Sequence, residues 1–332
     1  MNSNRDAILA RLGSSSRPVS GDALAQELGL SRAGIWKHIQ SMRKQGIRIE
    51  SFTGQGYQLR SDVLSPAMFR IELGDSLIGS ECMVVDEIDS TNREAMRQAE
   101  AGANEGLVII ANRQSEGRGR LGRSWHTAEH DSLALSILLR PTLPPEKVPQ
   151  LSLLTAVALH KALSSFASGI TIKWPNDILY DGAKVAGILT EMRAEPGCVH
   201  AVVIGIGVNI RRPEEGWPKE ITQRVTDLST ASRRELGRLD AAVSIIRAME
   251  SSYSEYLADG FAPVREAWWQ AHAASGHQVR AHGSSGYVEG IAEALDDDGA
   301  LLLRVNGQLQ RFIAGDIELM DMNREGWMDS NR

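Results

Sequence analysis

Hydrophobic residues in the first sixty positions recur at helical spacing in three short segments. The segments are residues 5–12, 20–28 and 31–44. Ser20 and Ser31 are the expected N-caps of the second and third helices, and Gly29 is expected in the left-handed conformation between them. Beyond them, apolar and polar residues alternate on both sides of the turn sequence Thr53–Gly56, which predicts a β-hairpin. Two helices joined by a tight turn and followed by a hairpin are typical of a winged helix-turn-helix.

From about residue 82 onward, the pattern alternates between strand and helix periods. Strands are expected at Cys82–Val85, Leu107–Ala111, Ser132–Leu139 and Val199–Val208. Helices are expected at Ser90–Ala101, ended by Gly102, and at Gln150–Ala167. The segment Ser61–Pro66 follows neither period and is expected to be a linker. The pattern therefore predicts a mixed α/β or α+β body behind the N-terminal segment.

Charge is distributed unevenly between these two parts. The 332 residues carry a net charge of −6, but the first sixty contain nine Lys or Arg and four acidic residues, so they contribute +5 and the remainder −11. A basic segment on an acidic body is expected to meet a polyanion, although uneven surface charge alone would give the same count. The outward face of the third helix favours DNA, with a protein partner as the alternative. The expected DNA-binding residues are Ser31, Arg32, Ala33, Trp36, Lys37, Arg43 and Lys44.

Composition excludes several other classes of protein. Apolar residues make up 42% and charged residues 23%, which is the range of globular rather than disordered chains. The longest apolar run, Ala201–Val208, is far shorter than the ~20 residues of a membrane helix. The first residues lack an apolar export segment, so a cytoplasmic location is expected. Cys82 and Cys198 lie far apart without metal-ligand spacing, so no metal site is expected.

A glycine- and arginine-rich segment lies between two expected strands. We call residues 117–123 (Gly-Arg-Gly-Arg-Leu-Gly-Arg) the Gly/Arg loop. Its glycines let the backbone approach a ligand closely, and its guanidinium groups suit phosphate and carboxylate oxygens. The dinucleotide-binding pattern is excluded because residues 124–131 do not open a periodic helix, and no P-loop sequence is present. Trp125 favours an anchored anion-binding loop over a flexible surface loop.

A second cluster surrounds an Asp181-Gly182 turn, which signals a hairpin between apolar runs. Asn176 and Asp177 are expected at the end of one strand, and Lys184 at the start of the next. A lysine facing the Gly/Arg loop would concentrate positive charge where a carboxylate attacks an α-phosphate, as in adenylation. Taken singly, these residues would be an ordinary surface lysine and turn aspartate.

Two further segments have open interpretations. In Asp89–Asn92, the hydroxyl of Ser90 or Thr91 either caps a helix or binds a neutral polar ligand. The sequence Gly205-Ile206-Gly207-Val208-Asn209 is either a site of tight packing or the floor of a ligand pocket.

At these residues the chain resembles the bacterial biotin protein ligases that also act as biotin operon repressors. The segments that carry the resemblance are Ser31–Ile39, Asp89–Asn92, Gly117–Arg123, Lys173–Asp177 with Lys184, and Gly205–Asn209. It covers nearly the whole chain, since Gln278–Met320, with short strands expected at Tyr287–Ile291, Leu301–Val305 and Gln310–Ala314, is similar to the family's small β-barrel. The implied fold class is α+β multidomain. It comprises a winged helix-turn-helix at 1–62, a mixed α/β ligase domain of the class II synthetase-like type at 63–273, and an SH3-like β-barrel at 274–332.

The resemblance also implies roles for individual residues. Lys184, Arg120 and Arg118 would be catalytic, and Asn176 and Asp177 would lie on the nucleotide or metal side. Biotin and its adenylate would contact Ser90, Thr91, Asn92, Gln114, Gly117, Arg118, Gly119, Arg120, Arg123, Trp125, Lys184, Gly187 and Asn209.

The implied reaction has two steps. Biotin and ATP, with Mg²⁺, give biotinyl-5′-AMP, and a lysine of the biotin carboxyl carrier protein of acetyl-CoA carboxylase then takes the biotinyl group. Positioning and electrostatics suffice for both steps, so no enzyme nucleophile is needed. The implied repressor binds operator DNA as a homodimer when it holds the adenylate, and no membrane partner is expected. Two alternatives are an effector-sensing transcription factor without ligase activity and a ligase that uses lipoate.

Overall fold

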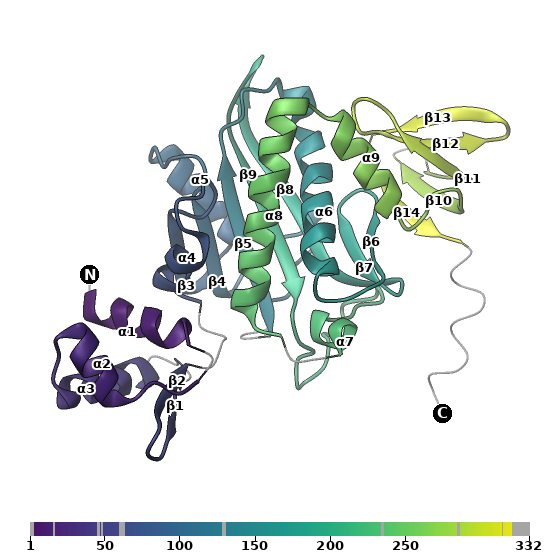
Figure 1. Cartoon of the computed structure of the whole chain (residues 1–332). Helices are drawn as coiled ribbons and strands as arrows, with labels where there is room; N and C mark the ends of the chain where they lie inside the picture. Colours follow the sequence, from purple (N-terminus) through teal and green to yellow (C-terminus); the bar gives the residue numbers. More distant parts are fainter. Residues whose placement is uncertain are drawn as a thin grey trace, which may run out of the picture.

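The computed structural model describes residues 3–15, 17–44, 47, 49–59, 64–127, 131–233, 236–283, 286–313 and 315–320. Figure 1 shows three parts: a small helical unit at the N-terminal end, a central sheet covered by helices, and a small sheet near the C-terminal end. The predicted linker overlaps residues 60–63, so the expected boundary between residues 62 and 63 falls outside the described residues. None of the described helices combines the length and the apolar character needed to cross a membrane.

The N-terminal part is the winged helix-turn-helix that the sequence predicts. Its elements are α1 (Ser3–Gly13), α2 (Gly21–Leu28), α3 (Arg32–Lys44), and the antiparallel strands β1 (Ile49–Phe52) and β2 (Gly56–Leu59). The Ser20 side chain accepts a hydrogen bond from the Ala23 amide, and Gly29 ends α2 with φ 64°. The Ser31 hydroxyl accepts from the Gly34 amide. The predicted caps and turn are therefore confirmed.

The central part is a seven-stranded sheet in the order β3-β4-β5-β9-β8-β7-β6, in which only β3 and β4 pair in parallel. The strands are β3 (Cys82–Ile88), β4 (Val108–Gln114), β5 (Ser132–Leu139), β6 (Ile170–Lys173), β7 (Asp177–Tyr180), β8 (Ala183–Glu195) and β9 (Cys198–Asn209). The predicted Asp181-Gly182 turn joins β7 to β8, with φ 48° and 69° at its two residues. Positive φ at both positions matches the twist of a tight hairpin.

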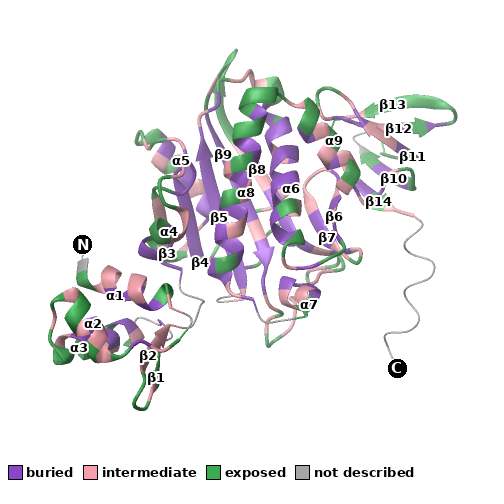
Figure 2. Ribbon diagram, viewed as in Figure 1, coloured by how far each residue is buried: buried purple, intermediate pink, exposed green. Residues whose placement is uncertain are grey.

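Helices cover both faces of this sheet. The main ones are α5 (Thr91–Glu100), α6 (Val148–Ser164) and α8 (Arg238–Asp259). On β4, Val108 and Ile110 belong to the core beneath α6 and α8, whereas Ile109 belongs to a separate core beneath α5. This alternation places α5 on the opposite face from α6 and α8 (Figure 1). Figure 2 shows the buried residues concentrated along the central strands and α6.

Several elements differ from the sequence predictions. Strand β4 extends to Gln114 rather than Ala111 because it pairs with β3 as far as Ile88. The linker prediction for Ser61–Pro66 was wrong at its end, because α4 (Pro66–Leu73) begins at Pro66 and the Ser65 side chain caps it by accepting from the Met68 amide. A capping serine before a proline could have predicted this helix. The remaining elements are η1 (Arg120–Gly122), η2 (Pro145–Lys147), α7 (Leu228–Ser232) and α9 (Ala262–Ala271).

The C-terminal part is a five-stranded antiparallel sheet in the order β13-β12-β11-β10-β14. Its strands are β10 (Gln278–Gly283), β11 (Gly286–Leu295), β12 (Leu301–Val305), β13 (Gln308–Phe312) and β14 (Asp316–Leu319). The strand expected at Gln310–Ala314 begins and ends two residues earlier, and Ala314 lies outside the described residues. With the helix-turn-helix and the mixed central domain, this β-domain confirms the predicted fold class.

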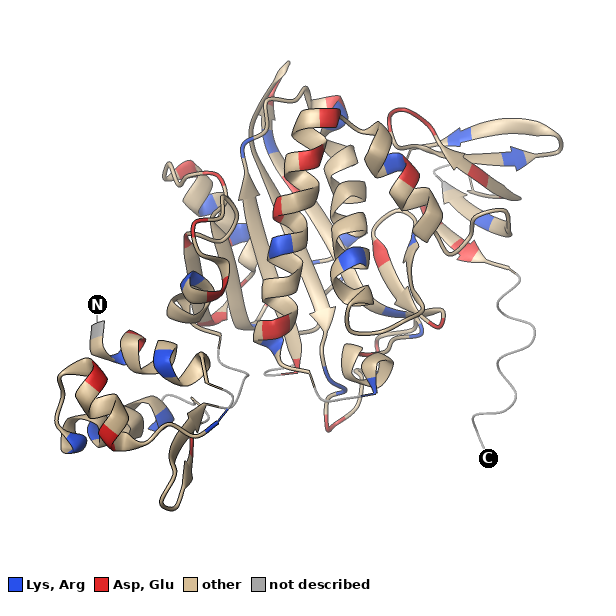
Figure 3. Ribbon diagram, in the orientation of Figure 1, with Lys and Arg blue, Asp and Glu red and all other residues tan. Residues whose placement is uncertain are grey.

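Charged side chains lie mainly on the outer elements. Figure 3 shows Lys, Arg, Asp and Glu along helices and loops, while β5 and β9 in the middle of the sheet are free of them. The pocket described below therefore brings its charges in from loops and strand ends.

Candidate active site

The structure gathers most of the predicted site residues around one hollow beside β5, β8 and β9, of about 790 Å³ including the space open to solvent. The predicted residues that line it are Ser90, Thr91, Asn92, Gln114, Arg118, Gly119, Arg120, Arg123, Trp125, Asn176, Asp177, Lys184 and Gly187. Four cationic side chains and two carboxylates are among its described lining residues. This excess of positive charge favours an anionic ligand.

The start of α5 forms a neutral hydrogen-bonding end of the pocket. Ser90, Thr91 and Asn92 are all buried. Ser90 occupies the N-cap position, but its side chain makes no capping hydrogen bond. The Thr91 amide instead donates to Oε1 of Gln114 at 2.8 Å. Helix capping therefore does not account for these polar groups, which favours the ligand-binding interpretation.

Glycines in β8 and β9 form the wall of the middle of the pocket. A Cβ atom on Gly207 would lie 2.3 Å from Cε2 of Trp125, and one on Gly205 would lie 2.2 Å from Oδ1 of Asn92. Contacts this short are not tolerated, so both glycines are required by the side chains that pack on them. The indole of Trp125 also approaches Gly187. The two interpretations of the Gly205–Asn209 segment therefore both hold, because the glycines that allow tight packing also form the wall of the pocket.

The β7–β8 hairpin supplies a cationic end. Nζ of Lys184 lies 2.8 Å from Oδ1 of Asp177, and the two side chains are only 15% and 16% exposed. The same ammonium lies 5.6 Å from the centre of the Trp125 ring. Nδ2 of Asn176 donates to the Ile188 carbonyl at 2.8 Å, which fixes this amide at the strand end. Lys184 is therefore held at the junction between the apolar wall and the polar strand end.

The Gly/Arg loop folds back on itself over the pocket. The Trp125 amide donates to the Gly117 carbonyl at 2.9 Å, and the Gly119 amide donates to the Arg123 carbonyl at 2.7 Å. A Cβ atom on Gly117 would lie 2.3 Å from the Trp125 carbonyl oxygen. Gly117 itself is not among the pocket-lining residues, and its role here is to let the loop close.

Each arginine of the Gly/Arg loop has a polar partner on another element. Arg118 pairs with Glu191 of β8 at 3.0 Å. Nη1 of Arg120 donates to Oδ1 of Asn176 at 3.1 Å. Asp316 at the start of β14 lies 2.6 Å from Arg123 and 3.8 Å from Arg120. The loop is thus connected both to the central sheet and to the C-terminal β-domain.

Two further residues, Asp316 and Gln223, also line the pocket and were not predicted from the sequence. Both lie far along the chain from the Gly/Arg loop, and neither belongs to a local motif. Asn209, in contrast, was predicted but is not among the described residues that line the pocket. Its Nδ2 donates to the Thr226 carbonyl at 3.0 Å, and the Thr226 amide donates to the Lys184 carbonyl at 2.9 Å. Asn209 therefore supports the backbone that carries Lys184.

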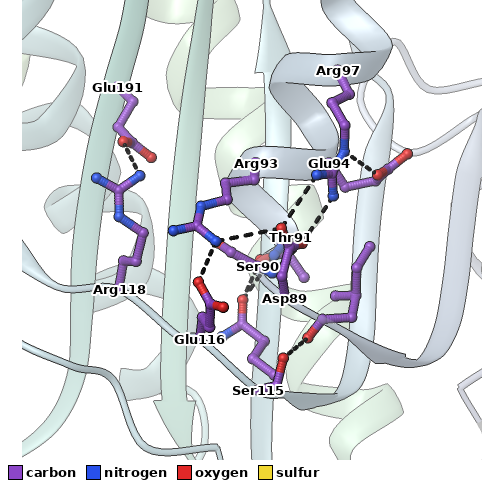
Figure 4. A network of polar contacts seen from close by, with 12 residues as sticks. Asp89, Ser90, Thr91, Arg93, Glu94, Arg97, Ser115, Glu116, Arg118 and Glu191 are labelled. Atoms are coloured by element: carbon purple, nitrogen blue, oxygen red, sulfur yellow. Dashed lines mark hydrogen bonds and ion pairs between the residues drawn. The ribbon is translucent and has the colours of Figure 1, made fainter.

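A charged network anchors the neutral end to the loop (Figure 4). Asp89 lies 2.9 Å from Arg97 and 3.4 Å from Arg93, and Arg93 also pairs with Glu116 at 2.5 Å. The hydrogen bond from Arg97 lowers the pKa of Asp89 to about 2, assisted by the Ser90 amide and Arg93. Asp89 is therefore ionised at neutral pH and ties the start of α5 to the residue before the Gly/Arg loop.

The predicted DNA-binding residues lie on α3 or, in the case of Ser31, directly before it, and all but one of them are exposed. Ser31, Arg32, Ala33, Trp36, Lys37 and Lys44 are exposed, with Trp36 57% exposed. Arg43 is half-buried, and its guanidinium donates to the Ile49 carbonyl at 2.7 Å and to the Ser51 hydroxyl at 2.8 Å. Arg43 therefore ties the helix to the wing.

Comparison with known proteins identifies the family to which this chain belongs. Models of an HTH domain, of the biotin/lipoate A/B protein ligase family and of the biotin protein ligase C-terminal domain match residues 4–58, 84–209 and 274–320, respectively. The bifunctional ligase/repressor BirA of Bacillus subtilis is 37% identical over 305 residues, covering 91% of this chain and 94% of the relative. The chain belongs to the family of bifunctional biotin ligases and repressors.

One further relative and one solved structure support the assignment. BirA of Escherichia coli is 31% identical over 308 residues, covering 90% of this chain and 92% of the relative. The biotin protein ligase from Aquifex aeolicus, solved in complex with biotin and ATP, is similar with a TM-score of 0.62 and 25% identity. That comparison covers 72% of this chain and 98% of the Aquifex chain. The region that matches the ligase family model holds every predicted pocket residue, whereas Asp316 lies in the matched C-terminal domain.

Proposed function

We propose that this chain activates biotin with ATP, transfers it to a lysine of a carrier protein, and represses transcription from operator DNA in response to biotin. One observation carries the ligase assignment. A single pocket has a neutral hydrogen-bonding end at Thr91 and Gln114, an apolar wall at Trp125, and a cationic end at Lys184 and Arg120. Biotin has matching parts in the same order, because a neutral urea ring is joined by an apolar chain to a carboxylate.

The cationic end suits the first step, in which the biotin carboxylate attacks the α-phosphate of ATP and pyrophosphate leaves. Two negatively charged groups must approach each other, and the Lys184 ammonium beside Asp177 neutralises both. Arg120 and Arg123 supply donors for the phosphate oxygens, with Arg118 at the start of the loop. Asn176 and Asp177 face the nucleotide.

Mg²⁺ enters as part of the substrate MgATP, because this ion usually binds through phosphates and few protein carboxylates. In the described part of the chain, His, Cys, Asp and Glu side chains form no group of three or more that could hold a metal ion. Asp177 and Asp316 are the two carboxylates among the described residues that line the pocket.

In the second step, a lysine amine of the carrier attacks the carbonyl carbon of the mixed anhydride, and AMP leaves. Positioning and charge neutralisation suffice for this transfer. A wide groove adjoins the pocket between the Gly/Arg loop, residues 218–223 and the C-terminal strands. This groove gives the lysine of a biotin carboxyl carrier protein, as in acetyl-CoA carboxylase, a route to the anhydride.

The test is incubation with biotin, MgATP and a carrier domain, with pyrophosphate release and carrier mass as readouts. We expect pyrophosphate release and a gain of one biotinyl group, and a Lys184→Ala variant should lose both. Binding of biotin without pyrophosphate release would instead identify an effector-sensing transcription factor. Lipoate as the preferred acid in a competition experiment would identify the related lipoate ligase.

The exposed face of α3 supports the repressor part of the proposal. Arg32, Trp36 and Lys37 would reach base edges in the major groove, with Ser31 and Ala33 beside them, while Lys44 and the wing would meet phosphates. A two-fold symmetric operator needs two such readers, so we place the adenylate-bound protein on DNA as a homodimer. Sedimentation with and without biotinyl-5′-AMP tests this step, and an unchanged mass would contradict it. Because the proposed activity uses ATP and acts on DNA, we expect it in the cytoplasm.

A further inference from the structure

A chain of hydrogen bonds runs behind the neutral end of the pocket, between Thr91 and Glu191, which Figure 4 labels. Its hub is Ser136 of β5, which is fully buried and does not line the pocket. The Ser136 oxygen lies 2.6 Å from Oδ1 of Asn92 and 2.8 Å from Oγ1 of Thr91. Glu191 accepts from the other side of Asn92 at 2.8 Å. The chain therefore connects a carboxylate on β8 to the pocket hydroxyl of Thr91.

The neighbours of Asn92 fix the orientation of its side-chain amide. One side faces Oε2 of Glu191 at 2.8 Å and the Leu189 carbonyl at 3.2 Å. Ionised carboxylate and carbonyl oxygens can only accept, so that side must be the NH₂ group. Gly205 leaves the space that the amide occupies. Oδ1 of Asn92 therefore faces Ser136 and needs a donor.

This orientation determines where the Ser136 proton goes. A hydroxyl carries one proton, and the acceptor Oδ1 of Asn92 is 2.6 Å away. Because the Ser136 hydroxyl donates its only proton to Asn92, its oxygen can take part in the 2.8 Å contact with Thr91 only as a hydrogen-bond acceptor. Thr91 has two acceptors within reach, the Ser136 oxygen at 2.8 Å and Oε1 of Gln114 at 3.1 Å, and the shorter contact favours Ser136. The Thr91 proton then points away from the pocket and into the sheet.

Gln114 places a second acceptor beside Thr91. Its Oε1 accepts the Thr91 backbone amide at 2.8 Å, and its Nε2 contacts Oγ1 of Thr127 at 3.1 Å, so its orientation is also determined. Oε1 of Gln114 lies 3.1 Å from Oγ1 of Thr91. With the Thr91 proton donated to Ser136, two acceptor oxygens stand side by side at the pocket. A ligand N–H placed between them would satisfy both.

We propose that Ser136 and Glu191 are positioning residues that set the direction of hydrogen bonding at Thr91, so that the pocket demands an N–H donor from the ligand ring. The inference rests on the proposed function, since the N–H of the biotin urea is the donor. Neither residue touches the ligand. Ser136 acts through Asn92 and Thr91, and Glu191 acts through Asn92 while also pairing with Arg118 of the Gly/Arg loop at 3.0 Å. An oxygen in place of the ring N–H would face the two acceptor oxygens with no proton between them.

The experiment compares biotin with the two cyclic carbamates in which oxygen replaces one urea N–H. This exchange hardly changes the size of the ring but removes the donor. Dissociation constants are measured by calorimetry for the wild-type chain and for Ser136→Ala. A site built around a hydrogen bond rejects a ligand that leaves its polar groups unpaired, so we expect the wild type to prefer biotin over one carbamate by about a hundredfold or more.

In Ser136→Ala, Thr91 loses its internal acceptor and can turn its proton towards the ring oxygen. We expect biotin to bind about tenfold more weakly and the preference over that carbamate to fall by about tenfold or more. Glu191→Gln should shift the preference in the same direction by a smaller factor, and its partly exposed side chain makes a folding defect less of a concern. Glu87→Gln is the control, because Glu87 pairs with Arg113 on the same sheet away from the pocket.

The outcomes separate the two proposals. Equal weakening of biotin and both carbamates in Ser136→Ala and Glu191→Gln would show a merely structural role and overturn the inference. The same would follow if neither variant changed any of the three dissociation constants. If the wild-type chain binds no biotin, the proposed function fails first, and that result is visible before any variant is compared.

Discussion

Replacing Gly207 by alanine tests whether packing of Trp125 on the sheet controls the pocket. The new Cβ atom would lie 2.3, 2.5 and 2.7 Å from three atoms of the indole, where carbon atoms need about 3.5 Å or more. Strand β9 is paired on both sides, with β5 and β8, so the strand cannot move away. The indole must therefore shift by about 1 Å or more, and the Gly/Arg loop must shift with it.

Overpacking of this kind costs about 1–3 kcal/mol. Because Trp125 lies on a loop, the strain should appear as loss of the closed loop rather than as unfolding. At about 1.4 kcal/mol per factor of ten, kcat/KM for biotin in a pyrophosphate-release assay should fall by about five- to a hundredfold. Thermal unfolding of the variant should change much less.

Gly187→Ala is the matched comparison on the neighbouring strand. Its Cβ atom would meet the flexible Lys184 side chain at 3.0 Å and the Trp125 ring at 3.2 Å, so a small adjustment suffices. We expect a loss of only a few-fold. Full activity of Gly207→Ala, or a larger defect in Gly187→Ala than in Gly207→Ala, would refute the role assigned to this packing.

Three further predictions concern other parts of the molecule. Burial lowers the pKa of His272 to about 4 from 6.5, so between these pH values the unfolded chain binds more protons than the folded chain. The free energy of unfolding should therefore fall by up to about 3 kcal/mol as the pH drops through this window. In urea titrations, the His272→Gln variant should lose this pH dependence. Arg120→Gly removes the guanidinium that contacts Asn176, so bound biotinyl-5′-AMP should dissociate at least about tenfold faster in a filter-binding chase. An unchanged half-life of the bound adenylate would contradict the role of Arg120 at the phosphate. Arg43→Lys keeps the positive charge but loses the two hydrogen bonds to the wing. The affinity for operator DNA, measured by fluorescence anisotropy, should therefore fall with little change in its salt dependence. An unchanged affinity would show that only the charge of Arg43 matters.

Local sequence signals predicted the elements whose determinants lie within a few residues of each other. Ser20, Gly29 and Ser31 set the helix boundaries of the N-terminal domain through contacts no more than five residues apart. The Asp181-Gly182 turn sets the pairing of Leu179 with Lys184, and beyond a register shift Asp177 lies 2.8 Å from the Lys184 ammonium. In each case, backbone conformation and short-range hydrogen bonds decide the structure, so the sequence carries the information locally.

The partners of the Gly/Arg loop could not be predicted in this way. Asp316 reaches Arg123 from a separate domain, 193 residues along the chain. Ser136 looks like any small residue in an apolar strand, and its role depends on which side chains meet across β5, β8 and α5. Arg43 carries a charge that suggests a phosphate contact, but its guanidinium group donates hydrogen bonds to Ile49 and Ser51 of the wing. Such contacts arise from tertiary packing, which leaves no periodic pattern in the sequence.

The proposed function requires that one ligand spans the neutral and cationic ends of this pocket. The most direct measurement is a structure of the protein with a stable analogue of biotinyl-5′-AMP. We expect the urea ring between Thr91 and Gln114, the aliphatic chain against Trp125, and the phosphate beside Lys184 and Arg120. A phosphate bound elsewhere, with the Gly/Arg loop turned away from the analogue, would show that the pocket does not bind the adenylate in this way.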